Sequence, residues 1–320
     1  MSSLIEQAAQ RLEQLRQAGI TIPEVEADLR PDLLFDSPAP SARQQAPTTP
    51  VFTQPMRESL EPVALSREVE LDLPSLSSKG LVTPGAARSH MADQYRVIKR
   101  PLIANAMGRG ASTVAHGNLI MVTSALPGEG KSFTSINLAM SIAAELDHTV
   151  MLVDADVARP SVLRMLGLPP GPGLLDLLEG KAEMSDVLLR TNVDKLTILP
   201  SGSPHPKATE LLASDGMSAL LDDMATRYPD RIIIFDSPPL LLTTEARVLA
   251  THMGQIVVVV QAEKTLQADV QSALATIESC PVRLLLLNLA QAKAEGGYGY
   301  GYGYGSSPSS DNSILEVPTA

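Results

Sequence analysis

A glycine-rich octapeptide between two apolar stretches places the strongest limit on what this chain can fold into. The octapeptide is ALPGEGKS, residues 125–132, and it joins a strand-like run at 118–125 to a helix-like stretch at 131–146. Glycine adopts the backbone conformations that turn N–H groups toward an anion, and the following helix adds the positive end of its dipole. A purely structural strand-to-helix turn is the alternative, but the Lys-Ser pair at its end favours a phosphate-binding loop of the GxxxxGK(S/T) type.

Apolar runs of strand length alternate with helical stretches from about residue 91 onward. The runs lie at 118–125, 149–156, 196–202, 231–239, 255–262 and 282–288, with helical stretches at 131–146 and 265–279. This alternation predicts an α/β fold with a mainly parallel sheet, and runs that are apolar throughout predict helices on both faces of that sheet. Together with the glycine-rich loop, the pattern indicates a P-loop NTPase fold with disordered tails at both ends.

Composition divides the chain into four regions. Residues 1–20 hold an amphipathic stretch, for which we expect a short helix that docks on a partner or packs locally. Residues 21–90 are rich in Pro, Ser, Gln and Ala, which predicts a mostly disordered linker. Within it, the alternating apolar residues of REVELDLPSL, residues 67–76, favour an extended arm along a domain. Residues 91–295 form the expected P-loop domain, and residues 296–320 the expected flexible tail rich in tyrosine and glycine.

Charge, cysteine content and hydropathy exclude several classes of protein. A net charge of −11 leaves no basic surplus for neutralising phosphates, so we expect no nucleic-acid partner. The single cysteine, Cys280, allows no internal disulfide and fits a reducing compartment. The N-terminus lacks the pattern of a signal peptide, and no apolar run approaches the ~20 residues of a membrane-spanning helix. These features predict a soluble, cytoplasmic protein.

The glycine-rich loop supplies most of the expected nucleotide-binding residues. Its glycines let backbone N–H groups face phosphate oxygens, Lys131 is expected to reach the β- and γ-phosphates, and the Ser132 hydroxyl to bind Mg²⁺. The expected set is Pro127, Gly128, Glu129, Gly130, Lys131, Ser132 and Phe133. Because no NKxD motif for guanine is present, the predicted cofactors are ATP and Mg²⁺.

Carboxylates at the ends of two other strand-like runs complete the predicted site. Asp236 ends one run, and Asp154 and Asp156 end another, two residues apart and so on one face while the chain is extended. Parallel α/β sheets bind ligands at the carboxyl ends of their strands. A single aspartate there is often a turn former or helix cap. Three aspartates beside a phosphate loop favour a Mg²⁺ site. The expected ligands of this ion are Ser132, Asp154 and Asp236.

These segments together resemble the motifs of a known family. ALPGEGKS, MLVDADVARPS and IIIFDSPPLL look like the Walker A, A′ and B motifs of the bacterial tyrosine kinases, which phosphorylate a tyrosine cluster at their own C-terminus. Further matches are GLLDLLEG at 173–180, the segment 196–212 and the strand-like run ending at Asn288. DQYRVIKRPLIANA, residues 93–106, most resembles the autokinases encoded with exosortase-linked exopolysaccharide systems.

The C-terminal tail contains a tyrosine cluster of the kind that this family phosphorylates. GGYGYGYGYG, residues 296–305, holds four of the six tyrosines of the chain. The resemblance implies that Tyr298, Tyr300, Tyr302 and Tyr304 accept phosphate. Glycine on either side removes steric obstacles to inserting a phenol into a foreign site. A sticky low-complexity tail without this role is the alternative.

The resemblance also implies roles, cofactors and partners. It implies an ATP- and Mg²⁺-dependent protein-tyrosine autokinase in which Lys131, Asp154 and Asp156 are catalytic, with Asp154 orienting or deprotonating the phenol. It implies that Asn288 contacts adenine and that subunits form a ring in which one tail enters the next site. The other implied partners are a membrane-embedded polysaccharide chain-length determinant or activator, which would recruit the protein to the inner face of the cell membrane, and a cognate tyrosine phosphatase. The implied role is regulation of exopolysaccharide synthesis, export or chain length.

The sequence departs from the family pattern at four places. Ala125 replaces the first glycine of the loop, Arg159 is all that remains of the usual arginine pair after the A′ motif, and Glu245 replaces an aspartate usual after Walker B. Asp93, Arg96 and Lys99 stand where the family has its ExxRxxR assembly motif, with the charges preserved. Spaced every three residues, they can lie along one helical side, either as an intersubunit contact or as a solvated face.

Two other classes of function remain open from the sequence. Regulatory ATPases of the partitioning or cell-division-positioning type share this SIMIBI-class fold and all three motifs. They carry an extra lysine early in the phosphate loop, where this chain has Leu126, and they hold DNA or membrane through basic patches or C-terminal amphipathic helices that this sequence does not display. The second alternative is a nucleotide-locked interaction protein whose tail associates through tyrosine stacking.

Overall fold

The computed structural model describes residues 66–85, 89–227 and 230–290, all within one compact unit. Its strands are β1 (Arg67–Val69), β2 (Leu119–Ser124), β3 (Thr149–Asp154), β4 (Leu189–Thr191), β5 (Leu196–Leu199), β6 (Arg231–Asp236), β7 (Gln255–Gln261) and β8 (Val282–Asn288). Its helices are α2 (Leu73–Ser78), α3 (His90–Ala106), α4 (Lys131–Ala143), α5 (Val162–Leu166), α6 (Leu174–Leu178), α7 (Met184–Val187), α8 (Ala208–Leu212), α9 (Asp215–Arg227), α10 (Glu245–Ala250) and α11 (Gln267–Ala275). The predicted N-terminal helix, the linker up to residue 65 and the tyrosine tail lie outside the described residues.

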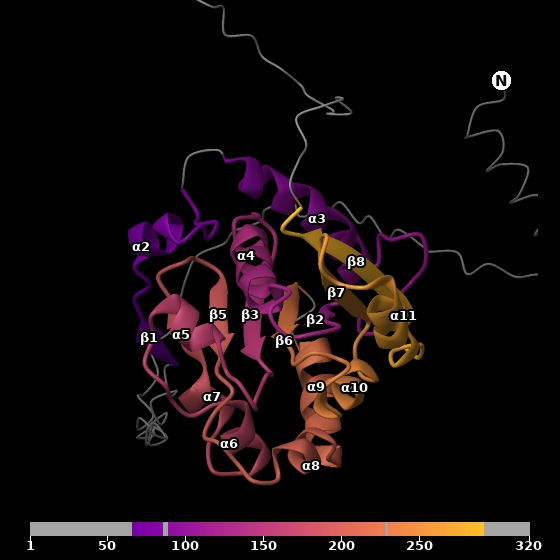
Figure 1. Cartoon of the computed structure of the whole chain (residues 1–320). Coiled ribbons are helices and arrows are strands. Elements are labelled where there is room, and N and C mark those ends of the chain that lie inside the picture. The colour runs from indigo at the N-terminus through magenta and orange to yellow at the C-terminus, as the bar shows by residue number, and fades with distance from the viewer. Residues whose placement is uncertain (1–65, 86–88, 228–229, 291–320) are drawn as a thin grey trace, which may run out of the picture. The chain divides into compact units, whose positions relative to one another are not determined.

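The strands form one sheet in the order β1-β4-β5-β3-β6-β2-β7-β8, with β1 and β8 at its two edges (Figure 1). Every neighbouring pair is parallel except β4 with β5. The six predicted apolar runs are confirmed as β2, β3, β5, β6, β7 and β8. The predicted P-loop NTPase fold with a mainly parallel sheet is therefore confirmed.

Helices cover both faces of the sheet, because alternate residues of each central strand point to opposite sides. Ile120 and Val122 of β2 pack in a core with residues of α2, α3, α4 and α5. Leu119 and Met121 of the same strand pack on the other face with residues of α6 to α11. Within the described ranges, no helix is both long enough and apolar enough to span a bilayer. The helix α4 is buried from Thr134 to Ala143, so the loop that precedes it rests on a rigid core.

The segment 66–85 packs against the sheet as part of the folded unit. β1 pairs with β4, and the backbone of Leu71 forms two hydrogen bonds with the side chain of Asn192, at 2.9 and 3.0 Å. Leu71, Leu76 and Leu81 are all buried in the core that contains α3 and α4. The folded unit thus includes residues upstream of the expected domain boundary. The segment 67–76, expected to be extended, forms a strand only at β1, and from Leu73 it is helical in α2.

Candidate nucleotide-binding site

The phosphate loop connects β2 to α4, as the sequence predicts. Gly128 and Gly130 have positive φ angles of 85° and 94°, which residues with a side chain rarely adopt, and Gly130 is the N-cap of α4. The first N–H groups of a helix have no partner inside it, so the loop and the start of α4 together offer donors to an anion. Ala125 is fully buried and its carbonyl accepts the N–H of Leu241 at 3.3 Å. That position therefore does not require glycine.

Lys131 and Asp156 form an ion pair beside the loop. Lys131 Nζ lies 2.6 Å from Asp156 Oδ2, and the two side chains are 12% and 6% exposed. The other oxygen of Asp156 accepts the N–H of Arg159 at 3.1 Å. The loop lysine and the second carboxylate of the A′ motif thus lie in direct contact.

Asp154 and Asp236 lie deeper, next to each other at the ends of β3 and β6. They are paired in register on these neighbouring strands, and both are fully buried. Asp154 Oδ2 accepts the N–H groups of Ser161 and Val162 at 3.0 and 2.9 Å, and Asp236 Oδ1 accepts the hydroxyl of Ser135 at 3.1 Å. Burial, helped by the charge of Asp236, raises the pKa of Asp154 to about 7. Burial also raises the pKa of Asp236, although the positive charge of Lys131 opposes it.

These carboxyl groups fit the Mg²⁺ ion that the motifs imply. Within the described residues, Asp154 Oδ1 and Asp236 Oδ2 are buried without a hydrogen-bond partner. Unpartnered carboxylate oxygens on adjacent strands suit a hard cation, which would also relieve their mutual repulsion. Ser132, the third predicted ligand, bonds through its Oγ to Ser161 Oγ at 2.8 Å. No group of three or more His, Cys or acidic side chains in the described ranges could hold a metal alone, so phosphate and water oxygens would have to complete its coordination.

A cavity of about 690 Å³ opens in front of the loop. The polar side chains that line it include Lys131, Ser132 and Asp156. The apolar side chains that line it include Phe133, Met165, Pro238, Pro239 and Leu242, and the arginines that line it are Arg159 and Arg164. The lining therefore offers contacts both to phosphates and to an aromatic ring. Sequence reasoning did not identify Arg164, Met165 or Leu242, because none of them stands within a recognisable motif.

The predicted nucleotide-binding residues occupy three different places. Those lining the cavity are Pro127, Gly128, Gly130, Lys131, Ser132 and Phe133. Glu129 points away from solvent and is only 2% exposed. Asn288 ends β8 and lies against the loop, where its Nδ2 donates to the carbonyl of Glu129 at 2.9 Å. A contact between Asn288 and adenine stays a prediction.

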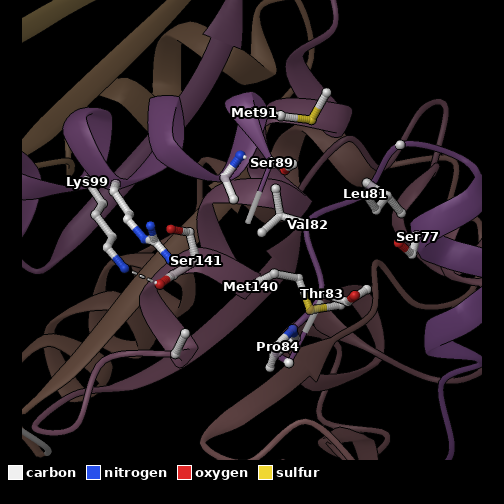
Figure 2. A pocket seen from close by; sticks show the side chains of 15 residues that line it. Ser77, Leu81, Val82, Thr83, Pro84, Ser89, Met91, Lys99, Met140 and Ser141 are labelled. Carbon is white, nitrogen blue, oxygen red and sulfur yellow. Dashed lines mark hydrogen bonds between the residues drawn. The ribbon is translucent and has the colours of Figure 1, made fainter. Parts of the chain in front are cut away.

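Asp93, Arg96 and Lys99 do not share one exposed side of α3. Asp93 and Arg96 form an exposed ion pair at 2.6 Å, whereas Lys99 is 4% exposed and pairs with Glu145 at 2.8 Å. Lys99 also donates to the carbonyl of Ser141, beside a second cavity of about 430 Å³ (Figure 2). Lys99 therefore fastens α3 inside the subunit, and only the first two positions of the expected assembly motif are available to another subunit.

Comparisons with known proteins give concordant results. The family model described as ParA: NUBPL iron-transfer P-loop NTPase matches residues 115–201. Tyrosine-protein kinase YwqD of Bacillus subtilis is 31% identical over 211 residues, which cover 66% of this chain and 85% of that protein. Tyrosine-protein kinase ptk of Acinetobacter johnsonii is 34% identical over 174 residues, or 54% of this chain, but this match spans only 23% of that longer protein.

Solved structures of kinase domains have the same fold. The kinase domain of Escherichia coli tyrosine kinase ETK superposes with a TM-score of 0.53 at 25% identity, covering 72% of this chain and 98% of that one. The chimerical protein CapA2B2 also gives a TM-score of 0.53, at 26% identity, covering 66% of this chain and 97% of that one. The match to YwqD covers 85% of that protein at 31% identity, and the ETK kinase domain is matched over 98% of its length. The chain belongs to the family of bacterial tyrosine-protein kinases.

Proposed function

We propose that this chain is an ATP- and Mg²⁺-dependent tyrosine autokinase that modifies Tyr298, Tyr300, Tyr302 and Tyr304 of C-terminal tails. The observation that carries the proposal is the position of the last strand. β8 is parallel to β7, and β7 to β2, so the carboxyl end of β8 lies on the same side of the sheet as the carboxyl end of β2, where the phosphate loop begins. There Asn288 donates a hydrogen bond to the loop carbonyl of Glu129, and Tyr298 follows ten residues later in the sequence. A connection of ten residues spans at most roughly 33–36 Å when extended, which is long enough for Tyr298 to reach this site.

The transfer would be an in-line attack of the phenol oxygen on the γ-phosphorus. The bond from phosphorus to the β,γ-bridging oxygen breaks, and the phenol proton passes to a carboxylate. Asp156 lines the cavity whereas Asp154 is fully buried, so Asp156 is the better placed of the two to accept this proton. When ATP binds, Lys131 would pair with phosphate oxygens instead of Asp156. The Asp156 carboxylate would then be free to accept the proton, and the ammonium group would stabilise the negative charge that develops on the phosphate. Asp154, Asp236 and Ser132 would hold Mg²⁺, which supplies further positive charge to the phosphates.

The apolar residues that line the cavity support the proposal that the acceptor is an aromatic side chain. A phenol ring is apolar except at its hydroxyl, and Phe133, Met165 and Leu242 offer a surface of matching character. Leu242 is 61% exposed, so its side chain is accessible to an incoming segment. Glycine between the tyrosines would let one phenol enter without the steric hindrance of bulky neighbours.

A phosphate-transfer assay separates this proposal from its two alternatives. Full-length protein is incubated with Mg²⁺ and ATP labelled at the γ-phosphate. Label in tyrosine supports the kinase. Free phosphate without labelled protein would support a regulatory ATPase of the partitioning type. If neither labelled protein nor free phosphate forms, an interaction protein would be supported. Mapping phosphopeptides of the tail then identifies which tyrosines accept phosphate.

Two variants test the assignment of the site. Lys131→Met should abolish tyrosine labelling, because Lys131 starts α4 directly after the phosphate loop and is the cation proposed to stabilise the developing charge on the transferring phosphate. Asp236→Asn should lose Mg²⁺-dependent labelling, since it removes one proposed ligand while keeping the size of the side chain. Labelling at the wild-type rate by either variant would overturn its assignment, provided that circular dichroism shows a folded protein.

The finer features of the function follow from the family resemblance. We propose the non-specific protein-tyrosine kinase class, a ring-like homo-oligomer, and recruitment to the inner face of the cell membrane by a polysaccharide chain-length determinant or activator. A cognate tyrosine phosphatase would reverse the modification. The pathway served would be exopolysaccharide synthesis or export, so replacing the gene by its Lys131→Met version should change the amount or chain length of the polymer. An unchanged polymer would contradict this role.

A further inference from the structure

Glu129, inside the phosphate loop, is held by Thr265, which follows β7, and by Asn288 at the end of β8. One of its carboxylate oxygens accepts the N–H of Leu126 at 2.7 Å, and the other accepts the hydroxyl of Thr265. Its backbone carbonyl accepts Asn288 Nδ2 at 2.9 Å. Thr265 and Asn288 are 136 and 159 residues away along the chain. These tertiary contacts fasten the loop to the sheet through a residue that is 2% exposed.

The two anchoring residues are joined to each other through the turn that follows β7. Thr265 Oγ1 accepts the N–H of Gln261 at 3.2 Å, and the carbonyl of Asn288 accepts the N–H of Ala262 at 2.9 Å. Asn288 also packs on the loop backbone, because a Cβ added to Gly130 would lie 2.1 Å from its Nδ2. The loop, the turn after β7 and the end of β8 therefore form one connected unit.

Backbone strain is present in both anchoring segments. Glu263 and Leu289 have positive φ angles of 61° and 56°, which are unfavourable for residues with a side chain. Leu289 is 62% exposed, so packing of its own side chain offers little compensation. Strained conformations persist where surrounding contacts over-determine the backbone, and they concentrate at functional sites. Glu263 lies two residues before Thr265 and Leu289 directly follows Asn288, so the strained positions adjoin the two residues that bind Glu129.

We propose that Asn288 and Thr265 are positioning residues that hold the phosphate loop in its phosphate-binding conformation through Glu129. This inference rests on the proposed nucleotide site, and it assigns Asn288 a role on the loop instead of on adenine. A loop whose N–H groups are already in place loses less conformational freedom when phosphate binds. The same contacts hold Asn288, from which the chain continues toward the tail at residues 296–320.

Inorganic triphosphate distinguishes the two roles of Asn288, because it has the phosphates of ATP and no base. The affinities of the full-length protein for Mg²⁺-ATP and Mg²⁺-triphosphate are measured by isothermal titration calorimetry. Each of the variants Asn288→Ala and Thr265→Val should bind Mg²⁺-ATP and Mg²⁺-triphosphate more weakly than wild type, by the same factor for the two ligands. We expect this factor to be about tenfold, for one lost hydrogen bond in a buried charged network. Thr265→Ser keeps the hydroxyl and should restore wild-type affinity. Thr276→Val is the matched control, because that hydroxyl donates to the carbonyl of Ala273 near the end of α11.

The possible outcomes are distinguishable. If Asn288→Ala weakens ATP but not triphosphate, Asn288 acts on the base and the inference is overturned. The inference would also be overturned if Thr265→Val bound both ligands as tightly as wild type. It would be overturned as well if wild-type protein bound ATP but not triphosphate. Wild-type protein that binds neither ligand would contradict the proposed function itself. Thermal unfolding checks that each variant folds. Thr265→Val replaces the hydroxyl by a methyl group, whereas Thr265→Ser keeps the hydroxyl and removes the methyl group.

Discussion

At the scale of single residues, burial divides the three aspartates of the site into two kinds. Asp156 lines the cavity and is paired with Lys131. Asp154 and Asp236 are fully buried, each with one carboxylate oxygen that has no partner among the described residues. Burial and the neighbouring charge of Asp236 raise the pKa of Asp154 to about 7, so below that pH the folded state favours a protonated Asp154 when no cation is bound. Asp154 therefore links pH to both stability and metal binding.

We expect Asp154→Asn to stabilise the protein at pH 8 relative to wild type. The pKa of Asp154 is raised to about 7 from an ordinary value of 3.8, so between these values the folded state keeps a proton that the unfolded state has released. Stability therefore falls as pH rises through this window. Wild type should lose roughly 2–3 kcal/mol relative to the variant between pH 5 and pH 8. Thermal unfolding of both proteins across that range, without Mg²⁺, measures the difference.

The exposed Asp93 supplies the control for this measurement. Asp93→Asn should leave the pH dependence close to that of wild type, because its carboxylate is exposed on α3. Added Mg²⁺ should raise the Tm of wild type more at pH 8 than at pH 5, since the ion competes with the retained proton. A stability difference between Asp154→Asn and wild type that stays constant with pH would contradict the raised pKa.

The sequence predicted the residue types of the site better than their contacts. Lys131, Asp154 and Asp236 could be identified because each stands at the end of a recognisable strand or at the start of a helix. The contact between Glu129 and Thr265 joins positions 136 residues apart, and no local pattern records it. Long-range hydrogen bonds of this kind depend on the order of strands in the sheet, which a single sequence leaves undetermined.

At the scale of elements, length decided which strands could be predicted. β7 and β8 have seven residues each and stand out as apolar runs. β1 and β4 have three residues each, too few for a periodic pattern, and depend on tertiary contacts such as the bonds between Asn192 and Leu71. In α3, a spacing of three residues could not reveal that Lys99 faces the core, because a buried lysine contradicts the usual preference of that residue.

Lys99→Met should destabilise the protein where Arg96→Ala should not. Methionine keeps most of the length of Lys99 but removes its bonds to Glu145 and to the carbonyl of Ser141, which we expect to lower the free energy of unfolding by about 1–3 kcal/mol. Arg96 and Asp93 form an exposed pair, so losing it should change stability by less than about 0.5 kcal/mol. Urea denaturation compares the two variants, and equal losses would contradict the different burial of the two cations.

The arm upstream of α3 should be essential to the stability of the domain. Leu76 of α2 is 1% exposed and packs in the core that contains α3 and α4, so Leu76→Ala should cost about 2–4 kcal/mol. Leu146→Ala is the matched control, because Leu146 is 86% exposed. Urea denaturation again measures both. If Leu76→Ala were as stable as the control, the segment 66–85 would not be part of the folded domain.

At the scale of the whole molecule, the position of β8 leaves open which subunit receives the tail. The ten residues from Asn288 to Tyr298 span at most roughly 33–36 Å when extended. That reach suffices for the site of the same subunit or of an adjacent one. The exposed pair of Asp93 and Arg96 is available for contacts between subunits, whereas Lys99 is not. Arg96→Ala, with little effect on stability, is therefore the variant with which light scattering can test assembly, and an unchanged mass distribution would contradict a role for this pair.

We expect phosphate to be transferred chiefly between subunits and the modified tail then to leave. Each phosphate adds about −1.5 to −2 charges to a protein of net charge −11, so a modified tail should be repelled by Asp154, Asp156 and Asp236. The test mixes full-length Lys131→Met, which has acceptor tyrosines and no activity, with active protein truncated after Glu295. Phosphotyrosine on the full-length partner would demonstrate transfer between subunits. If that partner stays unlabelled while wild type alone is labelled at a rate per molecule independent of concentration, transfer occurs within one chain.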